Sequence, residues 1–374
     1  MARLFTLIRE VNMEEYNFYW YFYAEVFGVS ETLAEKALKL YKDPQYIYEA
    51  KDESYVINGL KPKEIEILNF CKNREKLLKN MDESRRLGIH MMHEGENIFP
   101  EFVGLSDPPK VLFYKGKRPL LSPDNISMVG ARSCTEYGKS MAYNLALDFA
   151  IVGKTVISGL AVGIDGACHK GALDCGGLTY AILGCGLDLC YPFSNKILFD
   201  RIIKNGSVIS EYPVGVKALS WHFPKRNRII SALSDKLVVV EAKKKSGTYI
   251  TVEWALQKGN DIYAVPGRAT DPYSDGCNEL IKQGAGLITD IGDVYGEDLK
   301  IAAYMYRKIK NDSITLANEN RLVYNNCDLL PTDIGKIIRN TRLPENRVLE
   351  CLSQLEIEGF IEQPSKGYYC RKNV

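Results

Sequence analysis

The centre of the chain alternates short apolar runs with segments of helical length, and this alternation constrains the fold more than any other feature. The apolar runs lie at residues 126–130, 155–158, 179–183, 207–210, 237–240, 262–265 and 287–289. The helical segments between them lie at residues 137–152, 164–175, 195–204, 227–233, 248–258 and 278–282. Apolar strands that alternate with helices form a parallel sheet covered on both faces, joined by right-handed crossovers. The sequence therefore predicts an open, doubly wound α/β domain.

The two flanks of this region have different patterns. Residues 1–81 are rich in aromatic residues and helix formers, and they predict a helical module of the SAM or helix-hairpin-helix kind. Prolines interrupt residues 89–125, where we expect irregular structure with one short strand at 111–114. Residues 305–374 predict helix, helix and hairpin, the order of a winged helix. We therefore expect three domains, at residues 1–81, 82–300 and 305–374, in a chain of 374 residues.

Charge and composition limit the classes of function. Lys and Arg number 48 against 47 Asp and Glu, so any nucleic-acid surface must be a local patch. The aromatic run 16–27 contains Asn17 and Glu25 and is too short to span a bilayer, so no membrane segment is predicted. Ten cysteines are scattered singly, which is typical of reduced thiols in a cytoplasmic protein and predicts neither disulfides nor a metal site.

Three glycine-containing segments follow strands of the predicted sheet, at the edge where folds of this class bind ligands. Their candidate binding residues are Gly130 and Arg132; Ser158, Gly159, Ala161 and Gly163; and Lys245, Ser246, Gly247 and Thr248. Glycine lets backbone N–H groups approach an anion, and a helix N-terminus offers free N–H groups. The segments predict a phosphate-binding crevice. The alternative is that strand-to-helix turns need glycine in any case.

A local excess of positive charge lies close to this edge. Residues 217–248 contain eight Lys or Arg against two carboxylates, and the aromatic Trp221 and Phe223 adjoin the basic residues. The candidates here are Lys225, Arg226, Asn227 and Arg228. Arginine suits phosphates and aromatic rings stack on unpaired bases, so we expect the three basic residues to line one crevice with Arg132. The alternative is a solvated charged face.

Motifs for nucleotide chemistry are incomplete. Gly138-Lys139-Ser140 ends like a phosphate-binding loop but has Ser133 where the first glycine belongs, and Gly184-Cys185-Gly186 lacks the third glycine of a dinucleotide fingerprint. Asp165 and His169 are four residues apart on a predicted helix. We expect them to form a structural pair rather than a general base, because no nucleophile or metal motif accompanies them. No catalytic residue and no cofactor is predicted.

A set of motifs spread over residues 88–294 occurs in a characteristic order. They are Asp107-Pro108-Pro109, Val129-Gly130-Ala131-Arg132, residues 157–165, His169-Lys170-Gly171-Ala172-Leu173, residues 183–188, Tyr191-Pro192, Ser210-Glu211-Tyr212-Pro213, residues 223–234, Val240-Glu241-Ala242, residues 245–251, Ala264-Val265-Pro266-Gly267 and Gly276-Cys277-Asn278. In this order the motifs resemble the DNA-processing protein A family, DprA, also called Smf.

The resemblance implies an extended Rossmann-like domain that binds single-stranded DNA without being an enzyme. It further implies protection of incoming DNA, loading of RecA recombinase during natural transformation and recombination, and dimerisation through the same domain. By motif position the pocket arginine is Arg132, and the basic helix-opening segment contains Lys225, Arg226 and Arg228. Two positions depart from the family's pattern: Ala131 replaces a small hydroxyl residue, and Asn260 replaces an arginine.

Two other functions stay open on the sequence. A hydrolase of the cytokinin-activating phosphoribohydrolase type needs a glutamate three residues after its glycine-threonine pair, but Thr251 stands there and Glu253 comes two residues later. A transcription factor could read duplex DNA through the predicted winged helix. Residues 305–374 carry 11 basic and 9 acidic residues, which is little charge for tracking phosphates.

Overall fold

The computed structural model describes residues 2–102, 104–120, 122, 125–244, 246–312, 318–328 and 331–371, with side chains left undescribed at 2–14 and 309–312. The chain divides into two compact units, Met1–Lys300 and Ile301–Val374. The predicted boundary at residue 81 therefore lies inside the first unit. The candidate Lys245 lies outside the described residues.

The first unit is built on one sheet, whose described strands follow the order β1-β2-β6-β5-β4-β3-β7-β8-β9. Their bounds are β1 Ile89–His93, β2 Val111–Gly116, β3 Ile126–Val129, β4 Val156–Ser158, β5 Thr179–Leu183, β6 Ser207–Ser210, β7 Lys236–Val239, β8 Asp261–Ala264 and β9 Gly286–Leu287. The neighbouring strands β6, β5, β4, β3, β7, β8 and β9 run parallel to one another. At the edge of the sheet β2 pairs antiparallel with β6, and β1 pairs antiparallel with β2. After β3 the chain adds β4, β5 and β6 on one side of that strand, and it then adds β7, β8 and β9 on the other side of β3. The predicted α/β class, a doubly wound and mostly parallel sheet, is confirmed.

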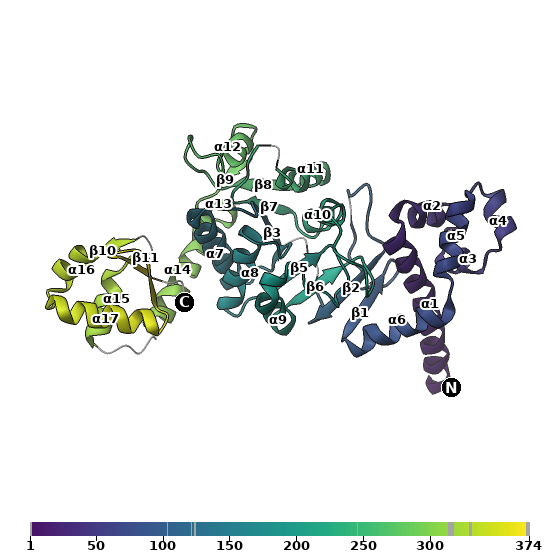
Figure 1. The fold of residues 1–374 in the computed structure, drawn as a ribbon, viewed down its shortest axis with the longest axis horizontal. Coiled ribbons are helices and arrows are strands. Elements are labelled where there is room, and N and C mark those ends of the chain that lie inside the picture. The colour runs from purple at the N-terminus through teal and green to yellow at the C-terminus, as the bar shows by residue number, and fades with distance from the viewer. Residues whose placement is uncertain are drawn as a thin grey trace. The chain divides into compact units, whose positions relative to one another are not determined.

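Helices cover both faces of the sheet (Figure 1). Their bounds are α7 Glu136–Ile151, α8 Ile164–Asp174, η1 Phe193–Asn195, α9 Lys196–Asn205, α10 His222–Ala232, α11 Thr248–Lys258, α12 Asp275–Lys282 and α13 Gly292–Tyr295. The pattern predicted α10 only from residue 227. It begins five residues earlier because Pro224 stands in its first turn, where a helix does not need the missing N–H.

The N-terminal helices share a core with one face of this sheet. They are α1 Ala2–Val29, α2 Glu31–Tyr41, α3 Pro44–Glu49, α4 Asp52–Ile57, α5 Pro62–Cys71 and α6 Arg74–Arg86. The buried Phe22 of α1 belongs to the same cluster as Phe113 and Val208 of the sheet, whereas Leu112 and Ile209 belong to the cluster on the opposite face. Neighbouring residues of one strand point to opposite faces, so each strand contributes to both cores.

The prediction of irregular structure from residue 89 was wrong at its start. Residues Ile89–His93 form β1, which pairs with β2 from Ile89 opposite Lys115 to His93 opposite Val111. The run contains two histidines and two methionines, which carry little strand propensity of their own. Pairing with β2 and burial of Met92 therefore stabilise a strand that local pattern does not reveal.

The second unit contains helices and a small antiparallel sheet in the order β10-β12-β11. Its elements are α15 Asn318–Asn326, β10 Thr332–Asp333, α16 Ile334–Thr341, α17 Glu345–Ile357, β11 Ile361–Ser365 and β12 Tyr368–Arg371, and α14 Glu297–Asp312 leads into it. Val348, Leu352 and Ile361 are buried in its core. The expected order of helices and hairpin is present, and the assignment of this unit as a winged helix stays a prediction.

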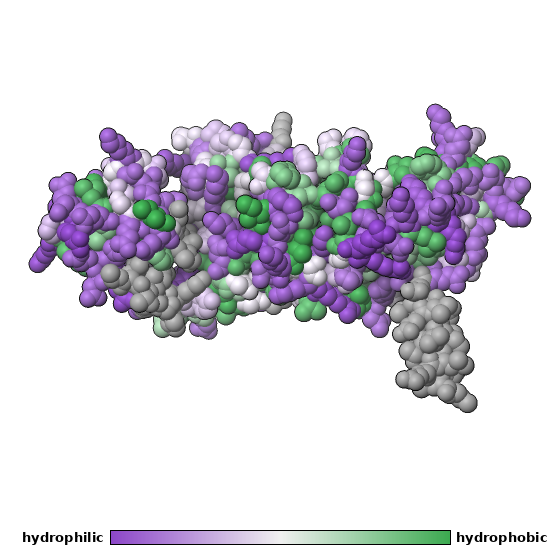
Figure 2. Space-filling view, turned by 60° about the horizontal axis from the view of Figure 1, so that its bottom comes forward, coloured by the Kyte–Doolittle hydropathy of each residue, from purple (hydrophilic) through white to green (hydrophobic). Residues whose placement is uncertain are grey.

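No helix among the described residues is long and apolar enough to cross a membrane. The face of the molecule drawn in Figure 2 is mostly hydrophilic, with hydrophobic side chains in separate patches.

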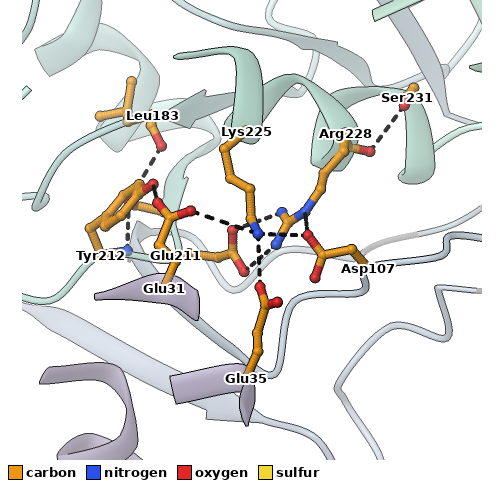
Figure 3. A network of polar contacts seen from close by, with 10 residues as sticks. Glu31, Glu35, Asp107, Leu183, Glu211, Tyr212, Lys225, Arg228 and Ser231 are labelled. Atoms are coloured by element: carbon orange, nitrogen blue, oxygen red, sulfur yellow. Dashed lines mark hydrogen bonds and ion pairs between the residues drawn. The ribbon is translucent and has the colours of Figure 1, made fainter. Parts of the chain in front are cut away.

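A cluster of six charged residues holds α10 against the rest of the first unit (Figure 3). We call it the α10 ion cluster; its members are Glu31, Glu35, Asp107, Glu211, Lys225 and Arg228. The Arg228 guanidinium, whose residue is 0% exposed, donates from Nη1 and Nη2 to the two carboxylate oxygens of Glu211 at 2.7 and 2.8 Å. Its Nε donates to Asp107 Oδ2 at 3.0 Å. This pairing accounts for a charged side chain in the interior.

The pKa values in this cluster reflect burial and pairing together. Burial raises the pKa of the Glu211 carboxyl, against the opposing effect of Arg228. Burial also acts to raise the pKa of Asp107, but Arg228 and Lys225 outweigh it and lower that pKa. Burial acts to lower the pKa of Arg228, and the paired carboxylates raise it above its usual range. Each charge depends on its partners remaining in place.

We expect Gly171→Ala in α8 to lower the free energy of unfolding by about 1–3 kcal/mol, because overpacking forces the backbone to shift. A Cβ at residue 171 would lie 2.2 Å from the carbonyl oxygen of Tyr143 on α7. Gly247→Ala is the matched control, since its Cβ meets nothing within 4 Å. Urea denaturation measures both. An unchanged Gly171→Ala midpoint would contradict the close approach of α7 and α8.

We expect Arg228→Met to lower the free energy of unfolding of the first unit by about 3–5 kcal/mol, because the buried Glu211 carboxylate loses its partner. Replacing the carboxylate as well, in Arg228→Met with Glu211→Gln, should recover most of that loss. Urea denaturation of the single and double variants tests this. Equal destabilisation in both would show that packing, not charge, is responsible.

Candidate nucleic-acid interface

Two of the predicted glycine turns meet at the carboxyl ends of β3 and β4. The N–H of Ile164, at the start of α8, donates to the carbonyl oxygen of Ala131 at 3.3 Å. A Cβ on Gly130 would lie 2.6 Å from Cγ1 of Ile164, so Gly130 permits this close packing. The two turns adjoin as the sequence predicted. For Gly130 the contact shows the structural role that the alternative reading assigned to it.

The turn between β4 and α8 has an unusual backbone. Leu160 is buried and has a φ of 56°, in the left-handed region that leucine rarely adopts. The Nδ2 of Asn195, in η1, donates to the carbonyl oxygens of Leu160 at 2.9 Å and of Ala161 at 3.2 Å. Gly163 has a φ of 84°, and its Cα faces the carbonyl oxygens of Ala131 and Arg132. Such strained turns occur where the surroundings hold the backbone in place, as they do at binding sites.

The guanidinium of Arg226 lies beneath this turn. Arg226 is 4% exposed, and its Nη1 donates to the carbonyl oxygens of Gly159, at 2.8 Å, and of Ile182. Its Nε donates to Oδ1 of Asn227 at 3.1 Å. A Cβ on Gly159 would lie 2.5 Å from Nη2 of Arg226, so the absence of a side chain at 159 makes room for the guanidinium.

Arg132 approaches the same place from the exposed side. Its guanidinium carbon lies 5.2 Å from the centre of the Phe223 ring, in the first turn of α10. The Phe223 ring in turn lies 5.4 Å from the ring of Tyr191, which is 49% exposed. A guanidinium over an aromatic ring beside a second ring presents both a charge and flat apolar surfaces to solvent.

The two arginines give this edge of the sheet, where the sequence predicted a crevice, a positive character. The pKa of Arg226 is lowered to about 10, chiefly by burial; Asp165 opposes this shift, and the nearby charge of Arg132 contributes to it. Within the described part of the chain, neither Arg132 nor Arg226 makes an ion pair with a carboxylate within 4.0 Å. Two guanidinium groups without carboxylate partners form a site suited to an anion.

Three polar residues behind the turn are structural. The hydroxyl of Ser158, a binding candidate, is buried and donates to the carbonyl oxygen of Met128 at 2.7 Å. Burial raises the pKa of Asp165 and lowers that of His169 to about 3. The expected pairing of Asp165 with His169 was wrong, because Nδ1 of His169 hydrogen-bonds Thr179 Oγ1 at 2.7 Å, and that hydroxyl donates to Val156.

The prediction that Lys225 and Arg228 face the crevice with Arg132 was also wrong. Both belong to the α10 ion cluster, where Lys225 Nζ lies 2.6 Å from Asp107 Oδ2 and 2.8 Å from Glu35 Oε1. Lys225 and Arg228 are three residues apart and share one side of α10, and carboxylates from distant parts of the chain neutralise them. Of the three basic candidates on α10, only Arg226 lies at the glycine turns.

The third glycine segment lies after β7 and is linked to the loop after Arg132 through Tyr273. The Nζ of Lys243 lies 4.3 Å from the centre of the Tyr273 ring, and the Tyr273 hydroxyl lies 3.3 Å from Ser133 Oγ. Ser246, Gly247 and Thr248 lead into α11, where Thr248 is buried and Gly247 is exposed. The segment therefore forms a second border of the same edge, with Lys243 as an exposed cation.

Carboxylates of the chain itself occupy two helix N-termini at this edge. The backbone N–H of Thr135, which caps α7, donates to Glu241 Oε2 at 2.9 Å. Asp165, in the first turn of α8, accepts from the backbone N–H of Ala161 at 3.4 Å. A carboxylate thus already stands at the N-terminus of α7 and another in the first turn of α8, so the positive groups beside the β3 and β4 turns are mainly the side chains of Arg132 and Arg226.

None of Tyr191, Lys243 and Tyr273 was among the binding residues predicted from the sequence, although Tyr191 belongs to a motif of the family. Phe223 was noted beside the basic residues as a ring that could stack on unpaired bases, but it was not among the predicted binding residues. The signal that could have identified Tyr191, Lys243 and Tyr273 is their position, since all three lie in segments that follow strands of the sheet, β5, β7 and β8. Among the described residues, no group of three His, Cys, Asp or Glu side chains could hold a metal ion.

Comparison with known proteins identifies the family of this chain. The family model for DNA recombination-mediator protein A matches residues 90–298. The DNA processing protein DprA of Streptococcus pneumoniae is 45% identical over 193 residues, which cover 51% of this chain and 67% of that protein. The DprA of Bacillus subtilis is 40% identical over 215 residues, covering 57% and 72%. Protein Smf of Escherichia coli is 33% identical over 276 residues, covering 72% and 74%.

Solved structures show the same relationship. The X-ray structure of DNA processing protein A from Streptococcus pneumoniae superposes with a TM-score of 0.64 at 32% identity, covering 75% of this chain and 97% of that one. The Helicobacter pylori protein, described for its single-stranded DNA binding mode, gives a TM-score of 0.52 at 32% identity, covering 57% and 96%. With a family model spanning more than half of its residues and relatives of this identity, the chain belongs to the DNA recombination-mediator protein A family, which includes the proteins named DprA and Smf.

Proposed function

We propose that this protein binds single-stranded DNA at the crevice between the β3 and β4 turns and the first turn of α10. The observation that carries the proposal is the convergence of Arg132 and Arg226 beside the Phe223 ring. Nucleic acid offers both a phosphate for the guanidinium groups and flat bases for the rings. Residues Gly159, Ala161 and Gly163 supply the turn that brings these groups together.

Exposed aromatic residues favour a single strand over a duplex. Trp221 is 62% exposed and Tyr191 is 49% exposed, close in sequence or in space to Phe223. Bases in a duplex are stacked on one another and do not present their faces, whereas an unpaired strand does. The single-stranded DNA binding described for the Helicobacter pylori relative supports the same ligand.

We propose that the protein acts by binding and not as an enzyme, without a cofactor. The rival hydrolase reading needs a glutamate at the start of α11, but Thr251 is buried there and Glu253 is exposed. The buried His169, with its lowered pKa, hydrogen-bonds Thr179 inside the fold, which supports a structural role for it. A search for release of base or phosphate from nucleotides would test this reading.

The finer roles follow from the family and are part of the proposal. We expect the protein to protect incoming DNA and to load RecA onto it in transformation and recombination, acting in the cytoplasm as a homodimer. The names of the relatives in Streptococcus pneumoniae and Bacillus subtilis support a DNA-processing role. Stimulation of RecA filament assembly on strands coated with a single-strand-binding protein would test the loading step.

We expect Arg132→Ala to weaken binding of a short oligothymidine by about tenfold or more, because a charge-assisted contact is lost. The slope of log affinity against log salt should flatten by roughly 0.7 for the lost phosphate contact. Arg132→Lys should restore the slope but only part of the affinity, because the planar fork is missing. Fluorescence anisotropy across a salt series measures both quantities.

The matched control is Lys51→Ala, an exposed cation in the N-terminal helices that should change neither affinity nor slope. Wild-type affinity and slope in a folded Arg132→Ala protein would show that the DNA site lies elsewhere.

We expect light scattering at micromolar concentration to give twice the mass of one chain, with and without DNA. A single-chain mass under both conditions would contradict the homodimer while leaving the DNA site untouched.

A further inference from the structure

We propose that Glu31 and Glu35 of α2 are positioning residues for the DNA-binding crevice. They hold Lys225 and, through Tyr212, His222, and thereby set the orientation of Phe223 and Arg226 on α10. This inference rests on the proposed function and adds to it a role for the N-terminal helices.

The first contact between α2 and α10 is ionic. The Lys225 ammonium lies 2.8 Å from Glu35 Oε1 and 3.7 Å from Glu31 Oε2, and it also lies 2.6 Å from Asp107. The Lys225 side chain is 19% exposed, so the contact is largely shielded from solvent. Figure 3 shows Glu31 and Glu35 reaching toward Lys225 from one side and Asp107 from another. The Lys225 side chain therefore attaches α10 to α2 and to Asp107.

The second contact passes through an aromatic pair. The Tyr212 hydroxyl donates to Glu31 Oε1 at 2.6 Å. The Tyr212 ring stacks on the His222 ring, with centroids 4.0 Å apart and an angle of 22°. His222 opens α10, and its Nδ1 hydrogen-bonds the carbonyl oxygen of Gly184 at 3.0 Å. The position of Glu31 is thus transmitted to the residue immediately before Phe223.

Both contacts act on the turn of α10 that serves the crevice. Phe223 and Arg226 lie on one side of the helix, toward Arg132 and Gly159, while Lys225 and Arg228 lie in the α10 ion cluster. Because ion pairs fix one side of α10, the residues on its other side are held in a defined orientation. Guanidinium and ring geometry at the crevice therefore depends on carboxylates that do not touch it.

Charge balance argues for positioning rather than simple neutralisation. The α10 ion cluster contains four carboxylates and two cations, more acid than the cations require. Carboxylates near a DNA site repel phosphate, so on electrostatics alone the removal of Glu31 and Glu35 would strengthen binding. Positioning predicts the opposite sign, and this difference makes the inference testable.

The experiment compares wild type with Glu31→Gln/Glu35→Gln in oligothymidine binding across a salt series. We expect affinity to fall about fivefold or more, in the range of one lost stacking contact, with the salt slope unchanged. The preference for a normal strand over an abasic strand of equal length should narrow, because the Phe223 ring is no longer held. Glu66→Gln, an exposed carboxylate on α5, is the control for loss of one negative charge and should not weaken binding.

Two further variants guard against loss of folding. Glu35→Gln alone leaves Glu31 and Asp107 beside Lys225, and Tyr212→Phe removes one hydroxyl without changing charge. Both variants should weaken DNA binding, as the double variant does, with little loss of thermal stability. DNA binding by the folded variants that is as tight as wild type or tighter, whatever its salt slope, would overturn the inference.

Arg132→Ala, measured beside these variants, separates the two proposals. Failure of wild type to bind the strand, or of Arg132→Ala to weaken binding, would contradict the proposed function itself. If Arg132→Ala weakened DNA binding while Glu31→Gln/Glu35→Gln bound with wild-type affinity, only the positioning role would be contradicted.

Discussion

A buried guanidinium must be surrounded by acceptors, and α10 meets this requirement in two different ways. Arg228 is enclosed by the carboxylates of Glu211 and Asp107, so its charge is cancelled within the fold. Arg226 is enclosed by backbone carbonyls, which accept its hydrogen bonds but do not cancel its charge. The first arginine anchors the helix, and the second leaves a positive potential at the carboxyl ends of the strands. Structure and proposed binding both depend on this asymmetry.

The sheet and its helices could be predicted from sequence because parallel strands are buried on both faces and read as continuous apolar runs. Strand β1 could not, because its residues lack that pattern and its stability comes from pairing with β2. The position of Arg132 could be predicted because it stands at a strand end, two residues past Gly130. The ion pairs of Lys225 and Arg228 could not be predicted, because their partners Glu35, Asp107 and Glu211 lie outside the segment in which the charges were counted. Counting charges along a segment does not register partners from other segments.

Anion sites in doubly wound folds commonly use helix N-termini. Here Glu241 caps the region of Thr135 at α7, and Asp165 lies in the first turn of α8. The positive charge at this edge therefore lies on side chains, Arg132 and Arg226, with Lys243 at the border. Side chains can follow an irregular backbone such as a flexible single strand, which a rigid array of backbone N–H groups cannot.

The space that Gly159 leaves for Arg226 has a consequence for how this protein can change over generations. A methyl group at 159 would displace the guanidinium, and a shorter residue at 226 would leave a void and two carbonyl groups without donors. We therefore expect the effects of substitutions at residues 159 and 226 to depend on each other. In a protein without the arginine at 226, residue 159 would no longer need to be glycine. Its binding site would then need a cation from another element.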